Sequence, residues 1–145
     1  MEEKPELKIS LLEPGKRFRP FVIEVTNDFV RAFAEAVNDD SLIYFDDRVA
    51  RDAGFARGIA PAGIAGIWGR RSYLEDFRMP EGGILIGLSY EFDCPAYVGD
   101  TITARAEVKE ISERKGRPLV RIRTEAENQR GERIGSVELS VIWPG

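Results

Sequence analysis

The chain has 145 residues, close to the length of one typical domain, and 43% of them are hydrophobic while 32% are charged. This supply of apolar side chains is enough for one sizeable core and too large for a disordered chain. The net charge of −4 gives no reason to expect binding to nucleic acid or to anionic lipid. The apolar runs are too short to span a membrane, and residues 1–5 lack the apolar segment of a signal peptide, so we expect a cytoplasmic protein.

Two residue counts restrict the chemistry. The sequence contains no histidine and a single cysteine, Cys94. The absence of histidine excludes Ser-His-Asp and Cys-His catalysis and every zinc site that needs imidazole, and we expect no bound metal. One cysteine excludes an intrachain disulfide. Acid–base chemistry must therefore come from carboxylates, tyrosine, lysine or backbone groups.

The first half of the chain predicts an arm, a strand and two helices within a single domain spanning 1–145. Residues 1–16 are polar and form the arm, and β-branched and aromatic residues at 18–25 predict a strand, which Pro20 favours at an edge or with a late start. Thr26 or Asn27 is expected to cap a helix that runs to about Asn38. Residues 47–53 predict a short second helix that stops at Gly54.

Residues 61–77 predict one long central helix. Pro61 suits the first helical position, and an apolar stripe follows at Ile64, Ile67, Trp68 and Leu74. Three glycines at 63, 66 and 69 cost about 2–3 kcal/mol relative to alanine, so tertiary packing must offset them. Small residues at this spacing let the helix backbone press close to a sheet or to a ligand. We therefore expect this helix to be central and surrounded by the sheet.

Four strand-like runs follow, at 84–92, 101–111, 119–127 and 134–143. Apolar and charged residues alternate along the last three, as expected of strands with one buried face. Short glycine-containing turns predict consecutive hairpins and hence antiparallel pairing. The whole order predicts an α+β chain with the hot-dog architecture, a curved antiparallel sheet wrapped around one long central helix. Because a fold does not fix a function, the site needs its own evidence.

Three segments carry a resemblance to a known family. Residues 36–46 (AVNDDSLIYFD) follow a helix containing Phe33-Ala34, residues 58–64 read GIAPAGI, and residues 94–101 read CPAYVGDT. Together they resemble the MaoC-like acyl-thioester hydratase/dehydratase family, a branch of the hot-dog superfamily, over roughly residues 18 to 143. The first segment is similar to the motif A-x-x-[GS]-D-x-N-P-[IL]-H-x-D, with Asp39 on the aspartate and Tyr44 on the histidine.

The resemblance implies a site. Asp39 and Tyr44 are the implied catalytic pair, which would act on the water that adds to a 2-enoyl thioester. The backbone N–H groups of Ala62 and Gly63, after Pro61, would polarise the thioester carbonyl, as a helix N-terminus can. Burial in an apolar tunnel would raise the pKa of Asp39 above about 3.9 and make it a better base. The acyl chain and its carrier would meet residues of the central helix and nearby arginines: Ile64, Gly66, Arg57 and Arg70.

Tyr44 departs from the active pattern, because a phenol with a pKa of about 10 does not replace imidazole as a base. The tyrosine form is similar to the branch in which one hot-dog subunit is catalytically silent and shapes the acyl pocket for a histidine-bearing partner.

Three functions remain open: a hydratase or dehydratase of 2-enoyl or 3-hydroxyacyl thioesters, a silent acyl-binding partner subunit, and a hot-dog thioesterase. The thioesterase is disfavoured because Glu75 and Asp76 fall near the end of the predicted helix rather than within it. The substrate would be an acyl-CoA or an acyl-carrier-protein thioester, with CoA or phosphopantetheine as part of the substrate and no separate cofactor. We expect a homodimer, or a heterodimer with a related subunit, because a small sheet leaves an edge to be covered.

Overall fold

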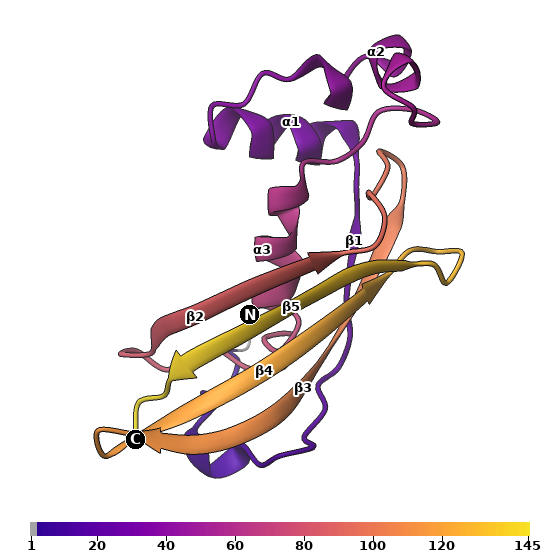
Figure 1. The fold of residues 1–145 in the computed structure, drawn as a ribbon. Coiled ribbons are helices and arrows are strands. Elements are labelled where there is room, and N and C mark those ends of the chain that lie inside the picture. The colour runs from indigo at the N-terminus through magenta and orange to yellow at the C-terminus, as the bar shows by residue number, and fades with distance from the viewer. Residues whose placement is uncertain (1–2) are drawn as a thin grey trace.

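A computed structural model describes residues 3–145 as a twisted five-stranded antiparallel sheet with helices on one face and beyond one end (Figure 1). The strands lie in the order β1 (Phe21–Glu24), β3 (Thr101–Arg114), β4 (Arg117–Glu127), β5 (Arg133–Ile142) and β2 (Ile84–Phe92). The helices are α1 (Asn27–Ala36), α2 (Asp47–Asp52) and α3 (Ala65–Arg71), with 3-10 turns at Ile9–Leu11, Leu42–Tyr44 and Ala62–Ile64.

The two faces of the sheet follow from the period-2 alternation in its strands. One face packs on α3, where the side chain of Trp68 is almost fully buried. The sheet contributes small and branched residues to this core, which include Ala104, Ala106, Val108, Ile122, Val137 and Leu139. The other face carries the alternating charged residues. The strand predictions made from alternation are therefore confirmed, and β2 has the predicted bounds.

Side-chain caps fix the helices that lie beyond the end of the sheet in Figure 1. The hydroxyl of Thr26 accepts a hydrogen bond from the Phe29 N–H over 3.0 Å at the start of α1, as predicted. The Asp46 carboxylate accepts one from the Arg48 N–H over 2.9 Å at the start of α2. The segment between these two helices carries Asp39 and Tyr44.

The central helix is shorter than predicted. Helical backbone runs from the turn at Ala62–Ile64 through α3 and ends at Arg71, rather than at residue 77. At this end the buried Ser72 hydroxyl donates to the Gly69 carbonyl over 2.8 Å and also bonds to the Thr124 hydroxyl at 2.8 Å. A serine that competes for a helix carbonyl favours a helix end, and the interior glycines give the helix little intrinsic stability. Burial of Trp68 therefore holds this helix in place.

The predicted hairpin between 84–92 and 101–111 is wrong. β2 pairs with β5, with Leu88 opposite Leu139, and therefore lies at the far edge of the sheet from β1. The connection at 93–100 is too long for a tight two-residue turn and crosses the end of the sheet. The fully buried carboxylate of Asp100 anchors it by accepting from the Tyr97 N–H at 2.9 Å, from Gln129 at 2.9 Å and from Arg57 at 3.3 Å.

The predicted arm contributes to the core. Leu7 and Leu12 are buried, and the Trp143 indole donates to the Leu7 carbonyl over 2.8 Å. Residues 1 and 2 of the arm lie outside the described residues. β1 begins at Phe21, after Pro20, and lies at an edge of the sheet, as the proline predicted. Among residues 3–145, no helix has the length and apolar character needed to cross a membrane.

Candidate functional site

Asp39 lies just beyond the end of α1, where its carboxylate gathers three hydrogen-bond donors. The Tyr44 hydroxyl donates to Oδ2 over 2.7 Å. The Ser41 hydroxyl and the Ser41 backbone N–H both donate to Oδ1, over 2.6 Å and 3.1 Å. The left-handed backbone of Asn38 (φ 56°) turns the chain out of the helix, and the 3-10 turn Leu42–Tyr44 brings the phenol back toward the carboxylate. The structure therefore brings together the two residues of the predicted pair.

The hydrogen bonds set the electrostatics of this pair. The pKa of Asp39 is lowered from 3.8, because donors from Ser41 and Tyr44 stabilise the carboxylate. The predicted rise in the pKa of Asp39 through burial is therefore wrong, since the carboxyl is only half-buried and well supplied with donors. The pKa of Tyr44 is raised from 10.0 by partial burial and by its bond to Asp39. At neutral pH the pair is a phenol that donates to a carboxylate, and neither group is a strong base.

The ring of Tyr44 lines an apolar cavity of about 440 Å³, called here the Tyr44 cavity. The backbone of Tyr44 lies against the 58–59 segment. The Ile59 N–H donates to the Ile43 carbonyl over 3.3 Å, and a Cβ added to Gly58 would lie 2.7 Å from the backbone carbonyl oxygen of Tyr44. The walls come from the start of the central helix, from β2, from the 93–96 connection and from β5, and include Ala62, Ile64, Trp68, Phe92 and Ile134. An apolar cavity beside a polar pair suits an acyl chain.

The start of the central helix meets this cavity. Its first turn is closed by the Ile64 N–H, which donates to the Pro61 carbonyl over 3.1 Å. The N–H groups of Ala62 and Gly63 precede this bond, and both residues are exposed. A Cβ on Gly63 would approach the Phe33 ring to 2.8 Å, so α1 packs directly on the turn at this point. The N–H groups of Ala62 and Gly63 thus lie at the start of the turn, and their role as an oxyanion site stays a prediction.

The other predicted binding residues divide between two places. Arg57 binds the Val98 carbonyl at 3.1 Å and Asp100 at 3.3 Å and lies over the Tyr97 ring, so its contacts anchor the 93–100 connection. Gly66 and Arg70 lie on another side of α3 from Trp68 and line a second cavity of about 330 Å³, called here the Arg70 cavity. Asp76, the thioesterase candidate, lies beyond the end of α3 and pairs with Arg19 at 2.9 Å.

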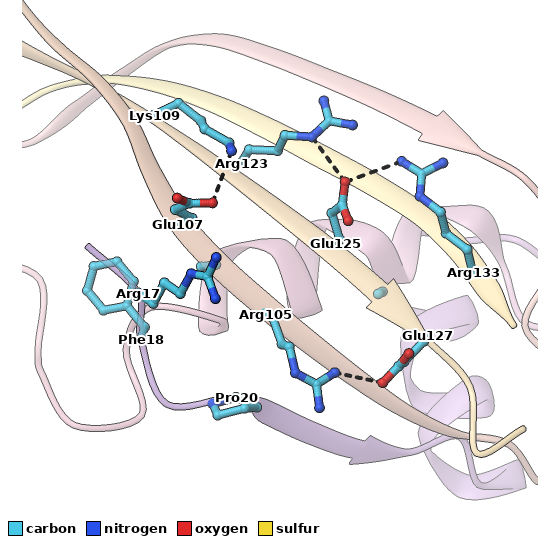
Figure 2. A pocket seen from close by; sticks show the side chains of 12 residues that line it. Arg17, Phe18, Pro20, Arg105, Glu107, Lys109, Arg123, Glu125, Glu127 and Arg133 are labelled. Carbon is cyan, nitrogen blue, oxygen red and sulfur yellow. Dashed lines mark hydrogen bonds and ion pairs between the residues drawn. The ribbon is translucent and has the colours of Figure 1, made fainter. Parts of the chain in front are cut away.

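Another hollow, of about 600 Å³, lies on the charged face of the sheet (Figure 2). Figure 2 shows the helices behind the sheet, so this hollow faces away from α3 and from both apolar cavities. Opposite charges pair across it, as in Arg105–Glu127 at 2.7 Å and Lys109–Glu107 at 3.0 Å. Exposed pairs of this kind contribute little to stability but keep the face hydrated. The charged face therefore has the character of a solvated surface.

Residues that the sequence did not single out complete the site. Ser41 supplies two of the three donors to Asp39, and the rings of Tyr90 and Phe92 stack at 5.9 Å, with one ring lining each apolar cavity. The sequence shows Ser41 at the position of the motif's asparagine. It does not show that β2 pairs with β5 at the edge of the sheet. Within the described residues, no group of three or more Cys, Asp or Glu side chains is arranged to hold a metal ion.

A family model described as "FAS1-like, dehydratase domain region" matches residues 13–137 of this chain. The chain belongs to this family. The matched residues include the Asp39–Tyr44 segment, the start of the central helix, strands β1 to β4 and the first half of β5.

Individual proteins agree with this assignment. An (R)-hydratase from A. caviae, involved in PHA biosynthesis, is 26% identical with a TM-score of 0.76 and covers 92% of this chain and 98% of its own. The HadBC (3R)-hydroxyacyl-ACP dehydratase complex from Mycobacterium tuberculosis gives 26% identity and a TM-score of 0.78 and covers 88% and 95%. The hot-dog fold is thereby confirmed, although its helix is short.

Among curated sequences, a UPF0336 protein from Mycobacterium leprae is 27% identical over 110 residues, which cover 72% of this chain. The match spans 66% of that relative's length.

Proposed function

We propose that this chain is a hydratase/dehydratase-type subunit that binds 2-enoyl or 3-hydroxyacyl thioesters of CoA or an acyl carrier protein. Membership in a dehydratase-region family supports the reaction class, and the similar (R)-hydratase and (3R)-hydroxyacyl-ACP dehydratase structures support the substrate class. An apolar cavity supports this location for the acyl chain, because it is lined by Tyr44, whose hydroxyl binds Asp39, and by Ala62 in the first turn of the central helix.

In this proposal the acyl chain enters the Tyr44 cavity with its thioester carbonyl at the first helical turn. The N–H groups of Ala62 and Gly63 donate to the carbonyl oxygen, where negative charge develops during hydration or dehydration. The Tyr44 hydroxyl, held by Asp39, is positioned to contact the 3-hydroxyl group or the attacking water. The walls at Trp68 and Ile134 exclude bulk water from the chain.

We further propose that the chain's own pair binds and orients the substrate but does not supply the base. A single observation carries this: the Asp39 carboxylate accepts three hydrogen bonds, and its pKa is lowered rather than raised. A weak base beside a phenol whose pKa is raised leaves no group that titrates near neutral pH. A histidine-bearing hot-dog partner would supply that group, and the similarity to a dehydratase that is itself a complex, HadBC, supports a partner subunit.

The alternative is a self-competent hydratase, which the hydrogen-bonded Asp39–Tyr44 geometry favours. The two versions are separated by purifying the chain alone and together with a histidine-bearing hot-dog protein encoded beside it, then following hydration of a crotonyl thioester. We expect hydration by the pair and none by the chain alone. Full activity of the isolated chain would refute the partner role. If acyl thioesters bind to neither preparation, the proposed substrate class is wrong.

A further inference from the structure

The Arg70 cavity combines a largely apolar lining with three polar side chains. Its walls come from α3, β2 and β5 and from the 79–83 turn, and include Gly66, Met79, Leu85, Leu88, Val137, Leu139 and Val141. Three polar side chains, Arg70, Tyr73 and Tyr90, also line it, and no carboxylate does. An arginine in the lining of a largely apolar cavity suits a ligand that carries an anionic group as well as hydrocarbon.

Arg70 and Tyr73 both have side-chain hydrogen-bond donors that find no acceptor among residues 3–145. Nη1 of Arg70 donates to the Tyr73 hydroxyl, and across residues 3–145 no carboxylate lies within ion-pair distance of this guanidinium. Tyr73 is fully buried, and its hydroxyl accepts from Arg70 but donates to no protein group in the part of the chain that the structure describes. A buried phenol proton without an acceptor, beside an unpaired guanidinium, calls for an anionic oxygen.

The Arg70 cavity lies next to the Tyr44 cavity. Phe92 lines the Tyr44 cavity and Tyr90 lines the Arg70 cavity, and their stacked rings are 5.9 Å apart. Along the central helix, Ala62 meets the first cavity and Arg70 the second, a separation of about 12 Å at the helical rise. Between them, the Tyr90 hydroxyl lies close to Gly66, where it would be 3.3 Å from an added Cβ. A linear chain that starts at Ala62 would have to displace the Tyr90 side chain at Gly66 to reach Arg70.

We propose that the Arg70 cavity receives the far end of an acyl chain that carries a carboxylate, so that the preferred ligands are ω-carboxyacyl thioesters. This inference rests on the proposed function, because it places the thioester end at the first turn of the helix. The guanidinium of Arg70 and the hydroxyl of Tyr73 donate to the carboxylate, while the apolar walls hold the methylene chain.

The test measures binding of saturated thioesters, which cannot be hydrated, to the protein in its purified assembly. A decanoyl thioester of N-acetylcysteamine is compared with its ω-carboxy counterpart of the same chain length. Neither ligand has a phosphate, so only the tail differs. We expect the ω-carboxy ligand to bind more tightly to the wild type. Arg70→Met should lower this preference roughly 10- to 100-fold and Tyr73→Phe about two- to tenfold, the range for charge-assisted and ordinary hydrogen bonds.

Arg71→Met is the matched control, because Arg71 is the next residue of α3 but lies over the Phe21 ring outside the cavity. It should leave the preference unchanged. Arg70→Gln provides a second variant of the exposed arginine, and thermal unfolding checks that each variant is folded. An unchanged preference in both folded Arg70 variants, or a wild type that prefers the decanoyl ligand, would overturn the inference while leaving the proposed function intact.

A further comparison separates two sources of anionic oxygen. If Arg70→Met weakens decanoyl-CoA binding but not the preference for the ω-carboxy tail, then Arg70 binds a carrier phosphate and the inference is wrong. Failure of every thioester to bind the wild type would instead refute the proposed function, on which the inference rests.

Discussion

The hydroxyl of Tyr44 donates to Oδ2 of Asp39 over 2.7 Å and thereby joins the end of α1 to the wall of an apolar cavity. Asp39 lines a separate, more open depression with residues of α1, whereas Tyr44 lines the Tyr44 cavity. The carboxylate therefore reaches the cavity through the phenol. The side chain at position 44 therefore determines which acid–base group is available to a ligand in the Tyr44 cavity.

Tyr44→His should therefore introduce a base where the chain lacks one. An imidazole at this position has an ordinary pKa of about 6.5, and the adjacent Asp39 carboxylate would orient it and raise that value. We expect hydration of a crotonyl thioester to appear in the isolated chain, or to rise by about 10²–10⁴-fold if a residual rate exists. The measurement is the loss of the conjugated enoyl thioester absorbance with time.

Asp39→Asn in the Tyr44→His background is the control for that gain. If the new imidazole depends on the carboxylate, the double variant should lose most of the added rate while binding acyl thioesters normally. A Tyr44→His protein that stays inactive although it is folded and binds substrate would show that Asp39 cannot support a base at position 44.

The lowered pKa of Asp39 predicts a pH dependence of stability. Because the carboxylate is stabilised in the fold, it contributes stability that is fully present above its unfolded pKa, near 3.8, and is lost as the pH falls through the lower folded value. The wild type should therefore lose its advantage over Asp39→Asn only in acid, below about pH 4. Urea unfolding of both proteins between neutral pH and pH 3 measures this difference. A difference that already shrinks near pH 6 would contradict the hydrogen-bonding pattern.

Much of the fold was predictable because its signals are local. A strand-like run marked the bounds of β2, Thr26 marked the start of α1, and the resemblance to the MaoC-like motif paired Asp39 with Tyr44. The partner of β2 was not predictable in this way, because turn composition does not specify which strand an eight-residue connection reaches. The connection is held by the buried Asp100, which binds Arg57 and Gln129 from two distant segments and the nearby Tyr97 N–H.

The candidate site was less predictable than the fold. The pKa of Asp39 depends on where two hydroxyls point, and the sequence shows only that Ser41 and Tyr44 are near in the chain. The same holds for α3: the apolar stripe from Ile64 to Leu74 suggested a long helix. The end at Arg71 instead accompanies the buried bond from Ser72 to Thr124, which lies on a strand far along the chain. Tertiary contacts determine both features.

Trp68→Ala should strongly destabilise the protein. The indole is almost fully buried between α3 and the sheet and lines the Tyr44 cavity, so its removal leaves a large void. We expect the free energy of unfolding to fall by about 3–5 kcal/mol, a large share of a domain's total. Chemical denaturation measures this change, and Trp68→Phe, which keeps an aromatic ring, should cost clearly less. An unchanged denaturation midpoint for Trp68→Ala would contradict the packing of the indole between α3 and the sheet.

The edge strand β2 should mediate association with a second hot-dog subunit. Six of its nine residues are large apolar side chains that are 38% to 52% exposed, and no strand within residues 3–145 pairs with its outer edge. A long apolar edge of this kind normally pairs with another chain, and a lysine on it prevents pairing. We expect a dimer at micromolar concentration by light scattering, and Ile86→Lys should shift it toward monomer. Val22→Lys, at an exposed position on the opposite edge strand β1, is the matched control and should leave the dimer intact. A wild type that is monomeric both alone and with a histidine-bearing partner would rule out this edge as an interface.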